Sequence, residues 1–224
     1  MSEGKLIVLE GIDGSGKSTQ YRLLKERFAR ENIPFTSTVF PRYQEESSAL
    51  IRLYLNGAFG EKPSDVNACA AAAFFAVDRY ASYKQDWGGT YEAGGLILSD
   101  RYTTSNAVHQ GCKVPEADLG AFFDWLYDFE YVRLELPKPD LVIYLDVDIE
   151  TSLARMRRRE AKNHTHADIH EKDSDYLLAC LRTGRLAAEH YGWRRIDFLR
   201  DGVEREKQEK NDEIFDIIKK EGLI

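Results

Sequence analysis

The chain has 224 residues, of which 43% are hydrophobic and 31% charged, a composition typical of one globular domain with a substantial core. Its formal net charge of −7 disfavours binding to nucleic acid or to acidic lipid, because such polyanions are held mainly by positive charge. No apolar run approaches the ~20 residues of a membrane span, and the chain does not start like a secretory signal, so we expect a cytoplasmic protein.

Short apolar segments that resemble buried parallel strands alternate with segments of helical periodicity. The first, residues 5–10, is closed by a glycine. This alternation predicts an α/β fold, with a five-stranded parallel sheet covered by helices on both faces. The expected strands are 5–10, 35–40, 96–99, 141–145 and 196–199, and the clearest expected helices are 18–31, 64–84, 115–129 and 211–220. We expect a single domain over 1–224, with a charged, mobile lid at about 155–173.

A phosphate-binding loop follows the first strand. Residues 11–18 fit G-x-x-x-x-G-K-[ST] and lie between a strand and a helix, as the P-loop NTPase fold requires. Lys17 is expected to reach the β- and γ-phosphates of ATP, and the Ser18 hydroxyl to bind Mg²⁺. The predicted ATP-binding residues are Gly11, Ile12, Asp13, Gly14, Ser15, Gly16, Lys17, Ser18 and Thr19. The loop alone leaves kinases, GTPases, motor ATPases and non-catalytic sensors open, although the guanine motif Asn-Lys-x-Asp is absent.

Arginines follow the second and third expected strands. Arg42 lies in Phe-Pro-Arg-Tyr, and Arg101 lies in Asp-Arg-Tyr. Ligands of open parallel sheets bind at the carboxyl ends of the strands, where an arginine fork can hold a phosphate. We therefore expect both arginines to grip the phosphate of an acceptor opposite ATP, with surface ion pairs as the alternative.

A second Asp-Arg pair, Asp78-Arg79, ends an alanine-rich helical segment that contains Phe74 and Phe75. An aromatic ring there could stack on a base, whereas the commoner role of helical aromatics is core packing. Because neighbours on a helix point about 100° apart, only one of the two rings can face the crevice.

A basic stripe follows the fourth expected strand. Arg155, Arg158, Arg159 and Lys162 share one helical face, and a solvated face is the alternative interpretation. The phosphate loop has no cation besides Lys17, so we expect an arginine of this lid to stabilise the transferring phosphoryl group. The histidines of the same segment fit no metal motif, and the cysteines are predicted to be reduced thiols. These residues are His164, His166 and His170, and Cys69, Cys112 and Cys180.

Taken together, these motifs resemble the thymidylate kinase family across nearly the whole chain. The motifs that carry the resemblance are residues 10–19, Phe-Pro-Arg-Tyr at 40–43, Phe-Ala-Val-Asp-Arg at 75–79, Asp-Arg-Tyr at 100–102 with Ser105-Asn106, and Pro-Lys-Pro-Asp at 137–140. The resemblance implies an ATP-dependent transfer of phosphate to dTMP, with Mg²⁺ as cofactor, in a homodimer that has its essential arginine in the lid.

The resemblance also implies roles for individual residues. Phe75 would stack on thymine, and Arg79 and Asn106 would contact its edge, with Phe40 and His109 nearby. Arg42, Tyr43 and Arg101 would hold the monophosphate. Asp13 would lie near the sugar hydroxyl and the metal site, whose expected ligands are Ser18, Asp13 and Asp100. Arg155 and Arg159 match the lid arginines, and Asp168 and Glu171 match an acidic pair after the lid.

Two histidines depart from the family pattern. His109 stands where relatives usually have a tyrosine beside the deoxyribose, and His170 stands where some lid-type relatives have a tyrosine. The alternatives are a deoxynucleoside kinase, disfavoured by Arg42, and a regulatory nucleotide-binding module, disfavoured by the lid arginines. Arg205 is expected on a solvated terminal helix, outside the site.

Overall fold

The computed structural model describes residues 4–163, 169–170, 173–200 and 202–224, and it leaves out the side chains of Arg159, Glu160, Lys162 and Asn163. Within these ranges, no helix has the length and apolarity needed to cross a bilayer. The strands are β1 Lys5–Glu10, β2 Thr36–Val39, β3 Leu96–Asp100, β4 Leu141–Asp146, β5 Arg194–Asp197, β6 Leu199–Arg200 and β7 Val203–Glu204. The α-helices are α1 Lys17–Arg30, α2 Ala49–Leu55, α3 Ala68–Ser82, α4 Gly88–Glu92, α5 Thr104–His109, α6 Leu119–Tyr127, α7 Ile149–Asn163, α8 Ser174–Tyr191 and α9 Lys207–Lys220.

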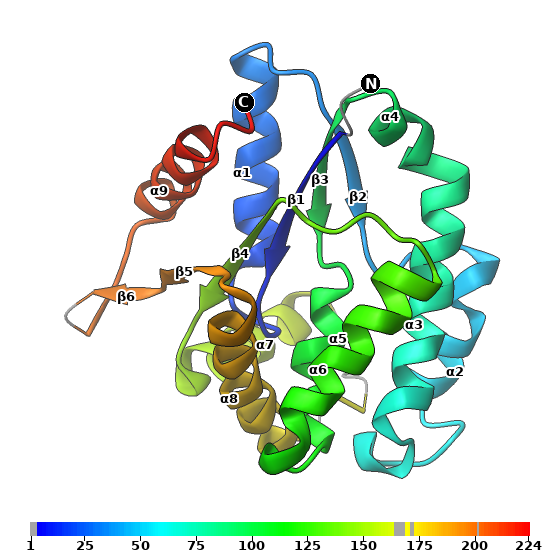
Figure 1. Ribbon diagram of the computed structural model, residues 1–224. Coiled ribbons are helices and arrows are strands. Elements are labelled where there is room, and N and C mark those ends of the chain that lie inside the picture. The colour runs from blue at the N-terminus through cyan, green and yellow to red at the C-terminus, as the bar shows by residue number, and fades with distance from the viewer. Residues whose placement is uncertain (1–3, 164–168, 171–172, 201) are drawn as a thin grey trace.

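The main sheet has five parallel strands in the order β2-β3-β1-β4-β5, which confirms the predicted α/β fold (Figure 1). β1 is the central strand, and Leu9 lies opposite Asp100 of β3. The phosphate loop and the segment after β3 therefore leave the sheet side by side, because the carboxyl ends of parallel strands share one edge.

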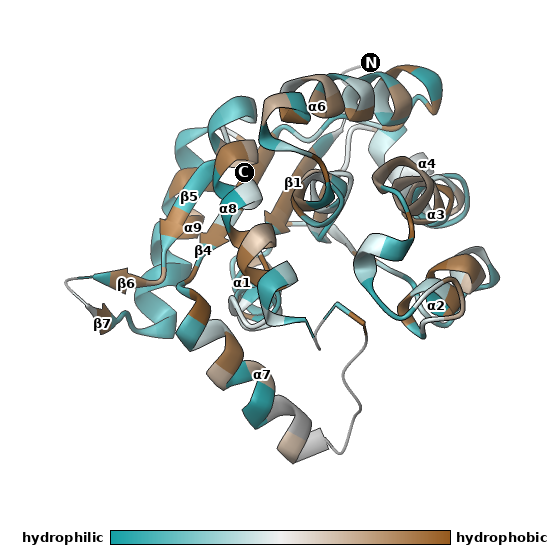
Figure 2. Ribbon diagram, turned by 90° about the horizontal axis from the view of Figure 1, so that it is seen from below, coloured by the Kyte–Doolittle hydropathy of each residue, from teal (hydrophilic) through white to brown (hydrophobic). Residues whose placement is uncertain are grey.

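Each face of the sheet is buried under helices, so the fold has three layers. Ile7 and Leu9 of β1 pack with Phe28 of α1 and Phe215 of α9 on one face. Leu6 and Val8 point the other way, into a cluster with residues of the α3–α4 region and the segment before β4. The apolar strands between more polar helices are visible in Figure 2.

The element boundaries differ from the sequence prediction at several helix ends. The expected helix 64–84 consists of three elements, a 3₁₀ turn at Pro63–Asp65, helix α3 and a π-helical turn at Tyr83–Trp87. The expected helix 115–129 begins as an α-helix only at Leu119 and continues through a π-helical segment, Asp128–Arg133. The predicted bounds of the last strand, 196–199, were wrong. β5 ends at Asp197, and Leu199 belongs to a separate antiparallel hairpin, β6–β7. This hairpin has strands of only two residues, too short to show an alternating pattern.

Candidate active site

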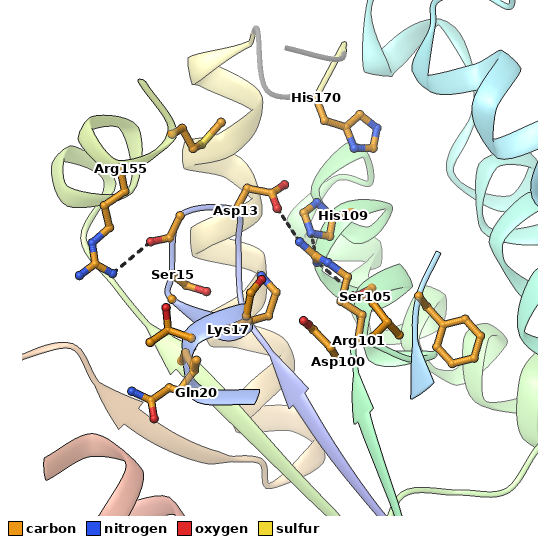
Figure 3. A pocket seen from close by; sticks show the side chains of 18 of the residues that line it. Asp13, Ser15, Lys17, Gln20, Asp100, Arg101, Ser105, His109, Arg155 and His170 are labelled. Carbon is orange, nitrogen blue, oxygen red and sulfur yellow. Dashed lines mark hydrogen bonds and ion pairs between the residues drawn. The ribbon is translucent and has the colours of Figure 1, made fainter. Parts of the chain in front are cut away.

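A cavity of about 900 Å³ opens at the carboxyl edge of the sheet (Figure 3). It is lined on one side by the phosphate loop and the start of α1, and on the other by the ends of β2 and β3 together with α3 and α5. The predicted site residues that line it are Asp13, Gly14, Ser15, Gly16, Lys17, Ser18, Thr19, Phe40, Tyr43, Phe75, Arg79, Asp100, Arg101, Asn106, His109 and Arg155.

The phosphate loop has the backbone geometry of an anion cradle. Gly14 and Gly16 have φ angles of 76° and 92°, which glycine adopts without strain. Gly16 is the N-cap of α1, no side chain caps the helix there, and its first turn has no acidic residue. The Ser15 hydroxyl is also buried, with no hydrogen-bond partner in the described part of the chain. The helix N-terminus is therefore left for an anionic ligand.

Lys17 lies at the floor of this loop and is 6% exposed. Its Nζ donates to the carbonyl oxygens of Gly11, at 2.6 Å, and of Ile12, at 2.9 Å. Burial, and then the nearby Arg101 guanidinium, lower the pKa of Lys17 to about 8. The ammonium group is thus held by neutral carbonyls, in a position where phosphate oxygens would stabilise its charge.

Arg101 lies in the cavity, held by groups from three sides. Its Nη2 is 2.7 Å from the Asp13 carboxylate, and its Nη1 is 3.0 Å from Nε2 of His109 and 3.4 Å from Glu10. Burial opposes its charge, but Asp13, Glu10 and Asp100 together raise the pKa of Arg101 above its usual value. Its backbone φ angle of 67° is rare for a residue other than glycine, and backbone strain of this kind is typical of functional sites.

Glu10 links the segments around Arg101 by hydrogen bonds, a role that the sequence did not predict. One of its carboxylate oxygens accepts from the Gly11 N–H at 2.9 Å, and the other accepts from Thr104 at 2.7 Å and Ser105 at 2.6 Å. It therefore ties the end of β1 to the start of α5, beside Arg101. The signal in the sequence was a carboxylate at the end of an otherwise apolar strand.

Arg42 is not brought to the cavity wall. Its Nε is 3.2 Å from Asp78, its Nη1 is 2.5 Å from Asp86 and its Nη2 donates to Ser47 at 2.8 Å. The Arg42 N–H also donates to Asp78 at 2.9 Å. In this structure Asp78 thus fastens the end of β2 to α3. Arg42 forms ion pairs, as in the alternative interpretation, but its side chain is only 11% exposed, so it is not a surface residue.

The neighbouring aromatic residues Phe74 and Phe75 point in different directions, as expected for adjacent positions on a helix. Phe75 lines the cavity, whereas the neighbouring Phe74 packs against Tyr54 and Phe59, outside the lining. Phe40 and Tyr43, which follow β2, line the same cavity as Phe75. This part of the cavity offers flat apolar surfaces that suit a planar base.

His109 and His170 stack in the cavity wall, with ring centroids 5.9 Å apart and planes 9° apart. Because a guanidinium only donates, the bond with Arg101 makes Nε2 of His109 an acceptor, so its proton lies on Nδ1. Burial, followed by Arg101, lowers the pKa of His109 well below its usual value, and burial followed by Lys113 lowers that of His170 to about 3. Both rings are therefore neutral at pH 7.

Arg79 and Asn106 also line the cavity, and they share a buried carboxylate, Glu130, as a hydrogen-bond partner. Sequence reasoning missed Glu130. It lies 51 residues after Arg79 in a segment without a recognisable motif, so nothing local marked it.

Two arginines of helix α7, Arg155 and Arg158, line the described cavity; both belong to the segment predicted to be a lid. Arg155 has Nη1 3.4 Å from the carbonyl oxygen of Gly14, pairs with Glu204 of β7 at 2.5 Å, and lies over the ring of Phe198 at 4.0 Å. It therefore already lies beside the phosphate loop. The side chains of Arg159 and Lys162, and residues His164, His166, Asp168 and Glu171, lie outside the described part of the chain.

The expectation that Arg205 is solvated was wrong, although it lies outside the cavity lining as expected. It precedes α9, is 8% exposed, and pairs with Glu209 at 3.0 Å and Glu213 at 2.5 Å. Its Nη1 also donates to the carbonyl oxygen of Asp197 at 3.1 Å. Arg205 therefore joins the β5–β6 turn to α9, so it cannot serve as a neutral surface control.

The fold and the cavity define a P-loop enzyme in which a second polar and aromatic subsite faces the phosphate loop. A family model of thymidylate kinases matches residues 9–187. The chain is 33% identical over 192 residues to the thymidylate kinase of Mycobacterium tuberculosis, covering 84% of this chain and 87% of that protein. It is 34% identical over 161 residues to a probable thymidylate kinase of Thermococcus kodakarensis, covering 70% and 73%. The chain belongs to the thymidylate kinase family and is a kinase.

The fold itself resembles that of a solved thymidylate kinase from Candida albicans. The TM-score is 0.72, with 22% sequence identity, over 100% of this chain and 95% of that one. This likeness supports the P-loop NTPase architecture of the chain.

Proposed function

We propose that this kinase transfers the γ-phosphoryl group of ATP to dTMP, giving ADP and dTDP. The observation that carries the proposal is the shared cavity, which is lined by the phosphate loop, by Arg101 and by the aromatic side chains of Phe40, Tyr43 and Phe75. An in-line transfer needs little covalent chemistry from the protein, so positioning and charge stabilisation account for most of the catalysis.

On the donor side, the loop and Lys17 would hold the phosphates of ATP. The backbone N–H groups at the start of α1, the buried Ser15 hydroxyl and the buried ammonium of Lys17 supply donors and positive charge in one place. Arg155, which lies against Gly14, would neutralise charge on the transferring group. A corresponding role for Arg159 remains a prediction.

A Mg²⁺ site fits the oxygen groups beside the loop. The Asp100 carboxylate is 8% exposed and accepts no hydrogen bond from the described part of the chain, and burial raises its pKa. Asp13 and Ser18 line the same cavity, and hard oxygen donors of this kind suit Mg²⁺. When bound, the ion would neutralise developing charge on the β- and γ-phosphate oxygens.

On the acceptor side, we propose that Phe75 stacks on thymine and that Arg101 holds the monophosphate. Phe40, Tyr43 and His109 would enclose the nucleotide, and Arg79 and Asn106 would read the edge of its base. Arg42 remains a predicted phosphate ligand. To contact a substrate, it would have to leave Asp78 and Asp86.

Comparing acceptors tests the proposed reaction. We expect rapid ATP consumption with dTMP, and little with thymidine or without acceptor, because only the monophosphate can pair with Arg101. Partial acceptance of dUMP is expected, since one methyl group gives only ~1–3 kcal/mol of discrimination. Coupled ADP release, measured with Mg²⁺ and again with excess EDTA, should show turnover only with the metal. Equal rates with thymidine would instead identify a nucleoside kinase.

We also propose a homodimer, in line with the family resemblance. Two helices each expose a pair of hydrophobic side chains at i, i+3 spacing: Leu50 and Leu53 on α2, and Val77 and Tyr80 on α3, between 40% and 53% exposed. The two helices lie side by side (Figure 1). Exposed apolar surface on adjacent helices favours self-association.

A charged substitution tests this interface. Leu53→Glu is expected to convert the dimer to a monomer in light-scattering measurements at micromolar concentration, because it places a charge in an apolar contact. Leu186→Glu, at a 37% exposed leucine of α8, is the matched control and should leave the mass unchanged. A wild-type chain that is already monomeric would contradict the proposal.

We propose that the chain acts in the cytoplasm as a single domain, with 155–173 as its lid. Its substrates would be free nucleotides, with no role for nucleic acid or membrane, in keeping with the net charge of −7.

A further inference from the structure

Glu130 is a buried carboxylate outside the cavity lining that holds two cavity residues at once. It lies in the π-helical segment Asp128–Arg133 and is 1% exposed. Its Oε2 accepts from Nε of Arg79 at 2.7 Å, and its Oε1 accepts from Nη2 of Arg79 at 2.7 Å. Two parallel bonds of this kind fix the plane of the guanidinium group, and therefore the direction of its remaining N–H groups.

The same carboxylate fixes the orientation of the Asn106 amide. Nδ2 of Asn106 donates to Oε1 of Glu130 at 2.7 Å and to the carbonyl oxygen of Ala72 at 3.1 Å. These two bonds use both of its hydrogens. A flipped amide would place Oδ1 against two acceptors. Oδ1 is therefore the atom left for a ligand, and no group in the described part of the chain donates to it.

Arg79 and Asn106 thus present opposite polarities side by side. Both contact the same oxygen of Glu130, and both line the cavity. Arg79 offers donors, because a guanidinium has no acceptor, and Asn106 offers its Oδ1 as an acceptor. The complementary partner is a base edge that has a carbonyl oxygen next to an N–H group.

We propose that Glu130 is the positioning residue that sets this polarity, and that it thereby selects 4-keto pyrimidines over 4-amino pyrimidines. This inference rests on the proposed function. Thymine presents the O4 acceptor beside the N3–H donor, which matches Arg79 and Asn106. Cytosine presents an amino donor beside an N3 acceptor. Its amino group would therefore face the N–H donors of Arg79, and its N3 would face the Oδ1 acceptor of Asn106. Glu130 itself touches no substrate.

The competing interpretation is that Glu130 only neutralises the buried Arg79. Removing one partner of a buried ion pair is destabilising in any case, so lower stability or lower activity would not separate the two roles. A preference between two acceptors does separate them, because a purely structural defect lowers activity with dTMP and dCMP alike.

The test is Glu130→Gln, assayed with dTMP and dCMP at saturating ATP and Mg²⁺. Both Glu130 oxygens accept from Arg79, so the glutamine NH₂ group faces an Arg79 donor whichever way the amide is turned. One of the bonds to Arg79 is therefore lost, and the guanidinium group and the Asn106 amide are no longer both held in place. We expect the dTMP-to-dCMP ratio of kcat/KM to fall at least about tenfold, mainly through a higher KM for dTMP. A folded variant whose ratio stays within about twofold of the wild-type value would overturn the inference.

Two further variants keep the test decisive. Asp146→Asn removes another buried carboxylate with two arginine partners, Arg185 and Arg195, away from the cavity lining, and should leave the ratio unchanged. If Glu130→Gln does not fold, Asn106→Ala removes the oriented amide and keeps the Arg79–Glu130 pair. It should lower the ratio by a similar factor, and an unchanged ratio there would also overturn the inference.

Calorimetric binding of dTMP and dCMP without ATP separates this inference from the proposed reaction. A wild-type protein that binds dTMP preferentially, loses that preference in Glu130→Gln and yet fails to turn over dTMP would contradict only the reaction. Turnover of dTMP with a preference that Glu130→Gln leaves intact would contradict only the role of Glu130. A wild-type protein that binds both equally would overturn it as well.

Discussion

The Arg101→Ala variant is expected to lose about three orders of magnitude in kcat/KM for dTMP, or about 4 kcal/mol of transition-state stabilisation. Arg101 carries the positive charge between the phosphate loop and the acceptor subsite, and Asp13, His109 and Glu10 fix its direction. A preorganised cation in a partly desolvated cavity stabilises developing negative charge far better than a solvated one. Steady-state kinetics with varied dTMP measure the effect.

The conservative variant and a surface control sharpen this prediction. Arg101→Lys should recover only part of the activity, because an ammonium keeps the charge but lacks the planar fork that bonds several acceptors at once. Arg133→Ala removes an arginine that is 71% exposed, and it should leave the kinetics unchanged. If Arg101→Ala retained more than about a tenth of the wild-type kcat/KM, Arg101 would be a structural residue only.

The phosphate loop and the strands could be predicted because their signals are local. Within residues 11–18, glycines occupy the positions whose positive φ angles the loop requires. β1 is a continuous apolar run because both of its faces are buried. The principle that ligands bind at strand ends then placed Arg101 beside the loop correctly. These inferences needed no knowledge of the strand order.

Partnerships between distant residues could not be predicted. Arg42 and Arg79 have similar sequence surroundings, because each is part of a family motif and each is followed by a tyrosine. In the structure Arg42 pairs with Asp78 and Asp86, while Arg79 turns inward to Glu130. The choice depends on which carboxylate the folded backbone brings within reach. Arg205 was misjudged for the same reason, since α9 supplies both of its acidic partners.

The second large effect is expected for Lys17→Ala, which should also lower kcat/KM at least about 10³-fold. A distinct pH signature should accompany it. Burial, and then Arg101, hold the pKa of Lys17 at about 8 without nucleotide, and the phosphates of ATP would raise it. At pH 8, roughly half of the Lys17 side chains are then neutral before binding, so binding takes up protons. The contribution of Lys17 to ATP affinity is complete below this pKa and declines as the pH rises through 8.

Calorimetry with a non-hydrolysable ATP analogue, in two buffers of different ionisation enthalpy at pH 8, measures this proton uptake. Lys17→Ala should abolish it. Lys113 is the matched control, because burial also lowers its pKa to about 8, while its Nζ bonds Tyr54 and Val66 outside the cavity lining. Lys113→Ala should therefore retain the uptake. Equal uptake in wild type and Lys17→Ala would mean that another group takes up the proton, and that Lys17 is already fully charged before the nucleotide binds.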